Sequence, residues 1–323
     1  MGAILHETSI PNDGTLVEPP LERDPRTIVC HGVADPLWDV DNVPVTYTND
    51  RWFSFLYRAD EKDLRRVLPE PLQLEDDLVE FWYNDVNHNT LGPFYELGVT
   101  IAASYGEYKG GYYAYMYLTQ DVGVFAGRER CGAFPKKVAY ITIMEHGGKL
   151  DDTNEPPGND FFSFMCVRRG YLIHTATGRY SGNDMSDLPA LPVYYGRTDW
   201  GRMNMRIVTS PDLRTSRWDL FYFPPLLEGK PRMTIRPATV RTAQAKDIRT
   251  WYFAATPFDN MAALIPPREL LGLVAVNFDL IITPAQSIWD KTVTRTDEDI
   301  AALGFATPYR YSMRHRFPKP IGV

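Results

Sequence analysis

The amino-acid sequence predicts a mostly β (α+β) protein with a few short helices. Short segments rich in aromatic and β-branched residues recur along the chain, and clusters of turn-forming residues separate them. Residues 274–282 alternate apolar side chains at every second position, which is the period of a strand with two unlike faces. Segments with helical spacing are short, and Pro or Gly ends each of them. These observations favour a barrel-like β domain over a helical bundle or a doubly wound α/β fold.

The first 44 residues differ from the rest of the chain. They are rich in Pro, Asp and Glu and show little periodicity, so we expect an extended N-terminal arm over residues 1–44. Residues 45–323 contain no linker-like or low-complexity stretch, and their length suits a single domain.

The expected elements follow in chain order from Val45. Aromatic-rich or alternating segments predict the strands, and a helix is expected from Asp60, an N-cap residue, to the stop at Pro69. Two further short helices are expected at 260–265 and from Asp297 to Gly304. Within 112–118, we expect residues 112, 114, 116 and 118 to share one face, with Tyr113, Tyr115 and Tyr117 opposite. The predicted strands are 52–58, 78–83, 99–105, 112–118, 122–125, 138–144, 161–167, 206–209, 218–223, 233–235, 240–245 and 274–282.

Composition excludes several classes of function. The net charge is −7 and the pI is about 5.4, which argues against binding to nucleic acid because phosphate recognition needs clustered Lys and Arg. No stretch reaches the ~20 apolar residues of a membrane span, and the N-terminus lacks the pattern of a signal peptide. The three cysteines are too few and too far apart for a disulfide framework. We therefore expect a cytoplasmic protein with no membrane and no nucleic-acid partner.

Common cofactor and metal motifs are missing from the sequence. There is no Gly-x-Gly-x-x-Gly or phosphate-loop pattern, and the six histidines never fall at metal-ligand spacing. No Gly-x-Ser-x-Gly elbow occurs either. We therefore expect no cofactor and no metal.

Two adjacent lysines, Lys136 and Lys137, lie in an otherwise apolar stretch from Ala133 to Tyr140. Burial disfavours the charged form of a lysine, and the neutral amine is the form that attacks a ketone. This segment is therefore a candidate Schiff-base site. The alternative from the residues alone is a pair of surface lysines at the end of a strand.

The lysine segment and several others resemble the acetoacetate decarboxylase family. Residues 127–137 carry the Gly-Arg-Glu…Pro-Lys-Lys signature, and the motifs Tyr-Arg-Ala-Asp (57–60) and Val-Leu-Pro-Glu-Pro-Leu (67–72) precede it. Glu-Leu-Gly (96–98), Lys-Gly-Gly-Tyr (109–112) and Met-Tyr-Leu (116–118) continue in the same order and spacing. The similarity covers about residues 48–291 and implies the β-barrel or cone of that family.

The resemblance implies roles for individual residues. Lys136 matches the lysine that forms the imine with the substrate, and Lys137 matches the neighbour that assists it. Glu96 matches an acidic residue of the family's site, while Glu129 belongs to the signature and is a structural candidate. We expect desolvation to activate Lys136 more than its neighbour does, because adjacent side chains of an extended segment point to opposite faces.

The sequence also departs from the family pattern. The family arginine expected to meet the substrate carboxylate aligns with Asp50, and Arg51 replaces it only with a one-residue shift. A second family acid aligns with Trp82, which suggests a larger and more apolar pocket. The expected substrate-binding residues are Arg51, Trp82, Tyr83, Tyr113, Met116 and Phe134.

Three functions follow as hypotheses. The first is cofactor-independent decarboxylation of a β-keto acid, bulkier than acetoacetate, through an imine on Lys136. The second is an aldolase, dehydratase or cyclase reaction on the same imine without loss of carbon dioxide. The third is a non-catalytic barrel that binds an apolar ligand. The family resemblance also implies a keto-acid substrate and a homo-oligomer.

Overall fold

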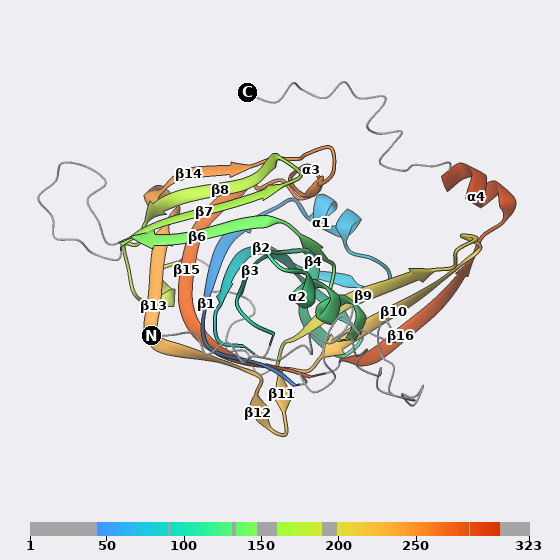
Figure 1. Cartoon of the computed structure of the whole chain (residues 1–323), viewed down its shortest axis with the longest axis horizontal. Coiled ribbons are helices and arrows are strands. Elements are labelled where there is room, and N and C mark those ends of the chain that lie inside the picture. The colour runs from blue at the N-terminus through green and yellow to red at the C-terminus, as the bar shows by residue number, and fades with distance from the viewer. Residues whose placement is uncertain are drawn as a thin grey trace, which may run out of the picture.

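The computed structural model describes residues 44–89, 91–130, 134–146, 160–188, 199–283 and 285–303 of the 323. Strands dominate these residues, and the helices are short (Figure 1). The strands are β1 (Val45–Arg58), β2 (Gln73–Val86), β3 (Phe94–Tyr105), β4 (Tyr108–Leu118), β5 (Lys136–Val138), β6 (Tyr140–His146), β7 (Phe161–Arg168), β8 (Tyr171–Arg179), β9 (Gly201–Thr209), β10 (Thr215–Phe223), β11 (Leu226–Leu227), β12 (Lys230–Pro231), β13 (Met233–Gln244), β14 (Ile248–Phe253), β15 (Glu269–Ile282) and β16 (Gln286–Thr294). The helices are α1 (Glu61–Val67), α2 (Asp121–Phe125), α3 (Met261–Leu264) and α4 (Asp297–Leu303), with the π-helical turn η3 (Ala126–Arg130) and the 3₁₀ turns η4 (Met185–Asp187) and η5 (Ala245–Asp247).

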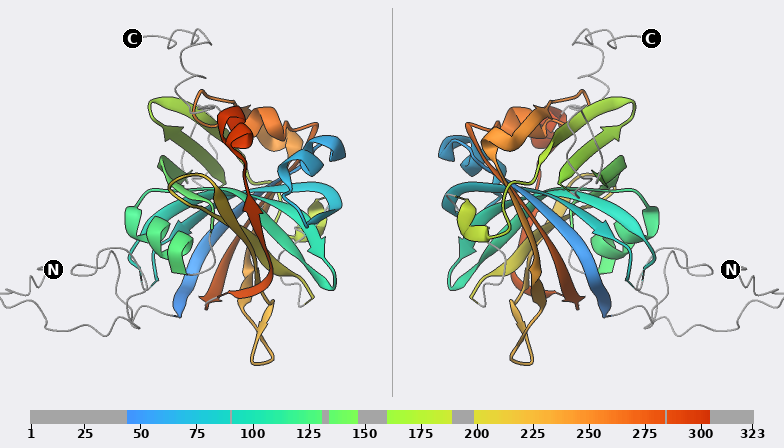
Figure 2. Two further views of the ribbon diagram at one scale, coloured as in Figure 1. Left: turned by 90° about the vertical axis from the view of Figure 1, so that its right-hand side faces the viewer. Right: turned by 90° about the vertical axis from the view of Figure 1, so that its left-hand side faces the viewer.

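A ten-stranded sheet forms the frame of the molecule. Its strands follow the order β13-β15-β1-β2-β3-β4-β9-β10-β16, and β5 pairs in parallel with β4 at the side of this path. The sheet curls strongly, so that its strands surround a central space in the view of Figure 1 and fan out in Figure 2. A second sheet, in the order β14-β8-β7-β6, lies across the outer face of β1 and β15.

The central strands of the large sheet are buried on both faces, and the two largest hydrophobic cores lie on these opposite faces. The outer core lies between the two sheets, where Phe55 and Phe164 meet edge to face with ring centroids 5.3 Å apart. The inner core fills the concave face, where Trp52 stacks on Trp82 at 4.5 Å. Each fully buried side chain of this size contributes about 1.5–3 kcal/mol. Strand β1 supplies both cores in alternation, because successive side chains of a strand point to opposite faces.

The predicted fold class is confirmed, with one element of the wrong type. The described residues are mostly β with few short helices. Within them, no pairing joins the two end strands, β13 and β16, so the curled sheet does not close into a complete barrel. Residues 122–125 form helix α2 and not the predicted strand. A four-residue apolar run does not distinguish a buried strand from a short helix. Gly123 lets α2 approach β4, because a Cβ there would lie 2.8 Å from Leu118 Cδ2.

The predicted facing of residues 112–118 is wrong because β4 contains a bulge. Val99 of β3 pairs with Tyr115, and the next residue, Thr100, pairs with Tyr113, so Ala114 is an extra residue in β4. A bulge of this kind shifts the alternation of side chains. Tyr113 therefore joins Met116 in the inner core instead of facing away from it.

Other predictions fall outside what the structure describes. The N-terminal arm predicted over residues 1–44 lies outside the described residues except for position 44, so it stays a prediction, as do the single-domain, homo-oligomer and cytoplasmic predictions. Within the described ranges, no helix is long and apolar enough to cross a membrane. No group of three or more His, Cys, Asp or Glu side chains in those ranges is arranged to hold a metal ion.

The outer core contains one buried histidine, which gives the fold a testable pH dependence. His174 is 0 % exposed, its Nδ1 shares a 2.6 Å hydrogen bond with the hydroxyl of Tyr83, and burial lowers its pKa to about 3. Between pH 6.5 and about 3 the unfolded chain binds a proton there that the folded chain does not. The free energy of unfolding should therefore fall with decreasing pH by up to about 1.4 kcal/mol per pH unit from this group.

Denaturant unfolding of wild type and His174→Gln between pH 7 and pH 4 measures this effect. The glutamine can keep the hydrogen bond to Tyr83 but does not titrate, so its stability should depend less steeply on pH. Equal slopes in wild type and His174→Gln would contradict the interpretation.

Candidate functional site

The lysine segment forms the short strand β5, which turns Lys136 toward the concave face of the large sheet. Met116 of β4 pairs with Lys136, and Tyr117 pairs with Lys137. Lys136 is 5 % exposed, and its Nζ donates a 2.9 Å hydrogen bond to Oε1 of Glu96, itself 4 % exposed. Glu96 comes from β3, the neighbour of β4. The structure thus brings together two predicted site residues that are 40 positions apart in the sequence.

The Gly-Arg-Glu motif makes room for this lysine. A Cβ at Gly127, in turn η3, would lie 2.6 Å from Cε of Lys136 and 3.0 Å from its Nζ. The carbonyl of Gly127 accepts a 3.2 Å hydrogen bond from the backbone N–H of Phe134, which closes the connection between η3 and β5. The Phe134 ring centroid lies 5.2 Å from Lys136 Nζ. The amine of Lys136 is therefore surrounded by the ring of Phe134, the backbone of Gly127 and the carboxylate of Glu96.

Lys137 points to the opposite face, as expected for adjacent residues of a strand. Its Nζ pairs with Oδ1 of Asp259 at 3.3 Å and lies 5.8 Å from the ring centroid of Tyr117. Asp259 also binds the guanidinium of Arg168 at 2.8 Å and accepts a hydrogen bond from Tyr117. The two lysines thus have separate carboxylate partners on separate faces.

Four of the predicted substrate-binding residues lie together in the inner core, namely Trp82, Tyr113, Met116 and Phe134, and the last two of them adjoin Lys136. Trp82 lies against Gly98, where an added Cβ would lie 2.1 Å from its Cζ2, and its Nε1 donates a 2.8 Å hydrogen bond to Thr100. Tyr113 meets Trp82 edge to face at 6.0 Å and Phe134 at 5.2 Å. A large indole is accommodated here because β3 carries a glycine opposite it.

A cavity that is partly open to solvent is lined by Phe134 and Tyr113. It lies between β4, β9 and β10 on one side and β13 and β15 on the other. Its lining is mostly aromatic and aliphatic, with two arginines: Trp52, Tyr113, Phe134, Trp200, Gly201, Arg202, Phe223, Pro224, Pro225, Pro231, Arg232, Met233, Leu280, Ile281 and Ile282.

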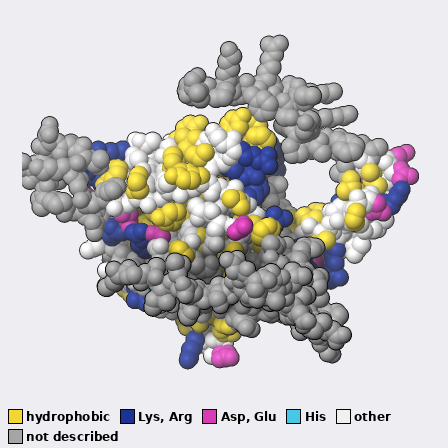
Figure 3. Space-filling view, in the orientation of Figure 1, with side chains coloured by type: hydrophobic (Ala, Val, Ile, Leu, Met, Phe, Trp, Pro, Cys, Tyr) yellow, Lys and Arg dark blue, Asp and Glu magenta, His cyan; other side chains and the backbone are white. Residues whose placement is uncertain are grey.

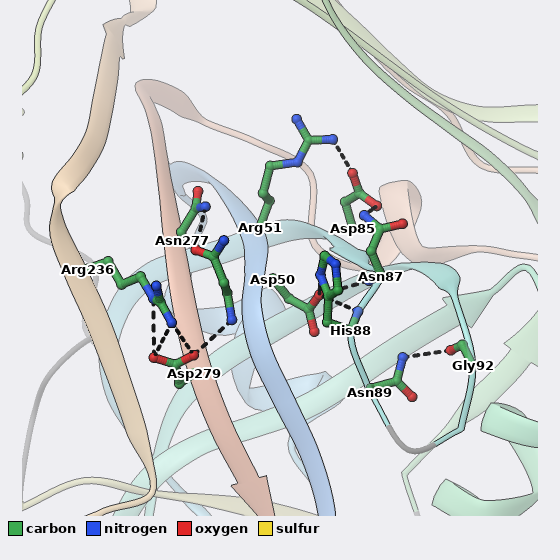
Figure 4. Close-up of polar contacts among 11 residues, drawn as sticks. Asp50, Arg51, Asp85, Asn87, His88, Asn89, Gly92, Arg236, Asn277 and Asp279 are labelled. Atoms are coloured by element: carbon green, nitrogen blue, oxygen red, sulfur yellow. Dashed lines mark hydrogen bonds and ion pairs between the residues drawn. The ribbon is translucent and has the colours of Figure 1, made fainter. Parts of the chain in front are cut away.

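The structure does not bring Arg51 and Tyr83 to Lys136. The side chain of Arg51 leaves the outer face of β1, pairs with Asp85 and Glu145, and points away from Asp50 (Figure 4). Tyr83 faces the outer core with His174. Asp50 is buried at the position of the expected family arginine, and its Oδ1 accepts hydrogen bonds from the backbone N–H groups of residues 87 and 88.

Sequence reasoning missed several polar residues of the inner face. Glu80 is 1 % exposed and accepts a 2.7 Å hydrogen bond from the hydroxyl of Ser54. Arg202 donates from Nε to the hydroxyl of Tyr113 at 3.1 Å. Burial raises the pKa of Tyr113, the guanidinium of Arg202 opposes this, and the charges of Glu80 and Glu96 raise it further. The signal for Glu80 was present in the sequence, because it stands two residues before Trp82 and so shares its face.

These observations define a class: a β protein with a lysine–carboxylate pair held on the buried face of a strongly curled sheet. The family model for acetoacetate decarboxylase (ADC) matches residues 34–237, and the chain therefore belongs to the acetoacetate decarboxylase family. This confirms the resemblance found in the sequence.

Individual relatives agree with the family assignment. The chain is similar to the acetoacetate decarboxylase of Clostridium acetobutylicum, with 37 % identity over 111 residues, 34 % of this chain and 45 % of the relative. It thus matches less than half the length of that relative.

Among solved structures, the fold is similar to an acetoacetate decarboxylase, with a TM-score of 0.62 and 21 % identity over 82 % of this chain and 96 % of that one. It is also similar to the enduracididine biosynthesis enzyme MppR, which was solved with the condensation product of pyruvate and imidazole 4-carboxaldehyde. There the TM-score is 0.58 with 14 % identity, over 78 % of this chain and 91 % of MppR. At such identities the likeness concerns the fold.

Proposed function

We propose that this protein decarboxylates a β-keto acid through a Schiff base on Lys136. The observation that carries the proposal is the buried pair of Lys136 and Glu96 beside an aromatic cavity. A free amine is a nucleophile toward ketones, and the Glu96 carboxylate at 2.9 Å is placed to take the proton that frees the Lys136 amine. Membership of the acetoacetate decarboxylase family supports the same chemistry.

The proposed reaction begins with attack of the Lys136 amine on the keto carbon. Glu96, at 2.9 Å, takes the proton that the amine must lose, and departure of water gives a protonated imine. The bond to the carboxylate carbon then breaks, its electron pair moves toward the imine nitrogen, and carbon dioxide leaves an enamine. Protonation at carbon and hydrolysis by water release the ketone and the free lysine.

A proton must reach the enamine carbon, and two buried carboxylates are candidates to deliver it. Glu96 can return the proton that it took, and Glu80 lies on the same concave face with Ser54 as its hydrogen-bond donor. A positioned acid typically contributes 10²–10⁴-fold to a rate. We favour Glu96 as the donor, because Lys136 Nζ forms a 2.9 Å hydrogen bond with its carboxylate.

The size of the substrate is the finer part of the proposal. Trp82 occupies the position where the family pattern has an acid, and aromatic rings line the cavity beside it. We infer that the substrate is bulkier than acetoacetate. Carbon dioxide release from benzoylacetate and from acetoacetate tests this directly. Benzoylacetate should have the higher kcat/KM, and equal or reversed values would count against a large apolar substrate.

The second candidate function keeps the imine but not the decarboxylation. The fold likeness to MppR favours it, since that enzyme was solved with a condensation product of pyruvate. Borohydride reduction in the presence of pyruvate and an aldehyde distinguishes the two. An adduct on Lys136 together with no carbon dioxide from any β-keto acid would replace the first proposal with the second.

The proposal predicts that Gly127→Ala impairs the reaction by moving Lys136. The new Cβ would lie 2.6 Å from Lys136 Cε, so the amine must shift away from Glu96. A displacement of about 1 Å can lower a rate by roughly 10²-fold. Steady-state kinetics on benzoylacetate measure the loss.

Gly178→Ala is the matched control for Gly127→Ala. Its Cβ would lie 2.5 Å from Phe162 Cζ in the outer core, far from the lysine in the fold. We expect a lower melting temperature but nearly wild-type specific activity for this variant. Equal losses of activity in both variants would show that general destabilisation, and not the position of Lys136, explains the effect.

A further inference from the structure

Arg232 stands out among the residues of the cavity. Its Nη1 donates to the hydroxyl of Thr283, and its Nε is buried without a hydrogen-bond partner among the described residues. No carboxylate within the described ranges forms an ion pair with it. Desolvation by burial lowers the pKa of its guanidinium. A partly buried cation with an unused donor is costly unless an anion completes it.

No acidic side chain of the described cavity lining competes with a bound anion for Arg232. Both charged residues of the lining that the structure describes are arginines, and no acidic side chain is among them. Arg202 already donates to the hydroxyl of Tyr113 and to the carbonyl of Gly201. Arg232 is therefore the residue with free capacity for a ligand, and guanidinium groups bind carboxylates through charge-assisted hydrogen bonds.

Arg232 lines the cavity directly, whereas Lys136 is adjacent to it through Phe134, which belongs to the lining. Arg232 precedes β13 and lies with Met233 and residues 280–282 of β15. Lys136 lies beside Phe134, which packs on Tyr113 of β4 and stacks on Phe223 of β10 at 5.2 Å. Strands β13 and β10 stand near opposite ends of the strand order, and the curl of the sheet brings them to one cavity.

We propose that Arg232 binds a second carboxylate, at the end of the substrate remote from the ketone, so that the substrate is an elongated keto diacid. This deepens the proposed function and rests on it. The carboxylate that leaves as carbon dioxide is two bonds from the carbon that joins Lys136, so it stays beside that lysine. An anion at Arg232 is a different group, and the apolar lining of the cavity suits an aliphatic or aromatic spacer.

Octanoate is a probe that cannot react with Lys136 and so tests Arg232 independently. Titration followed by tryptophan fluorescence is suitable, because Trp52 and Trp200 line the cavity. Arg232→Met should weaken octanoate binding roughly 10–100-fold, as expected for loss of a hydrogen bond to a charged group. Arg232→Lys should recover part of the loss. Weaker binding in Lys136→Ala with unchanged binding in Arg232→Met would overturn the proposal.

The substrate class is tested with a matched pair, 3-oxooctanedioate and 3-oxooctanoate, which differ only by a terminal carboxylate or methyl group. Wild type should prefer the diacid about tenfold or more in kcat/KM, as expected for a hydrogen bond to a charged group, and Arg232→Met should bring the ratio of the two kcat/KM values to about one. An equal preference in both proteins would refute the role of Arg232. No turnover and no borohydride adduct in wild type, with octanoate binding still dependent on Arg232, would instead refute the proposed function alone.

Discussion

Lys136→Met should lose carbon dioxide release from β-keto acids by at least about 10³-fold and should form no borohydride adduct. Removal of a covalent nucleophile eliminates the low-barrier route altogether, and binding alone cannot replace it. Methionine fills similar space, so the inner core around Phe134 and Met116 should remain packed. Steady-state kinetics and the melting temperature of the variant measure the two effects separately.

The adjacent lysine supplies a matched control. Lys137 binds Asp259 on the other face of the sheet, and its side chain is 39 % exposed. Lys137→Ala should therefore change kcat/KM by less than about tenfold. A loss in Lys137→Ala as large as that in Lys136→Met would contradict the assignment of one nucleophile and one distant neighbour.

Glu96→Gln should lower kcat by roughly 10²–10⁴-fold, the range for loss of a positioned acid or base. The amide keeps the size of the side chain and can still hydrogen-bond to Lys136, but it cannot accept the proton of the attacking amine. Kinetics across pH 5–9 provide a readout that a merely structural role would not move. In Glu96→Gln, the pH–rate profile should lose the change in kcat that arises from ionisation of the Glu96 carboxyl group.

Asp85→Asn is the comparison for that variant. Asp85 is equally buried, but it belongs to the outer face, where it pairs with Arg51. This variant should be less stable than wild type and keep a pH–rate profile of unchanged shape. An unchanged profile in Glu96→Gln would remove Glu96 from the proposed proton transfer.

The family resemblance named Lys136 and Glu96 as candidate site residues because each of them lies in a short motif. The Gly-Arg-Glu…Pro-Lys-Lys segment and Glu-Leu-Gly are both short and local, and each residue keeps its place within its motif. The pairing of β3 with β4 and of β4 with β5 then brings them together. Opposite directions for Lys136 and Lys137 followed from the geometry of any strand.

The sequence could not place Arg51, because the strand that carries it is apolar on both faces. Residues 52–57 supply both cores, so no period-two pattern marks the inner side. A bulge between Tyr47 and Asp50, with Asn49 at φ 56°, sets the alternation and leaves Asp50 and Trp52 inward. The bulge in β4 changed the facing of Tyr113 in the same way. Such irregularities depend on the neighbouring strand and not on local propensity.

The cavity was also beyond the sequence, because distant strands build it. Arg232 and Arg202 come from different parts of the curled sheet, and no motif links them. The sequence also did not show which face of the smaller sheet is exposed. Tyr140, Met144 and Tyr252 are exposed on the smaller sheet, and Figure 3 shows hydrophobic side chains at the surface of that part of the molecule. The alternation of side chains along these strands did not show which face packs against the large sheet and which faces solvent.

Borohydride trapping followed by peptide mapping tests the central claim most directly. Wild-type protein is incubated with benzoylacetate and sodium borohydride, digested and mapped by mass spectrometry. The account predicts a single reduced adduct on Lys136, of the mass expected for the imine of the decarboxylated ketone. An adduct on Lys137 instead, or an unmodified Lys136 while carbon dioxide is released, would contradict it.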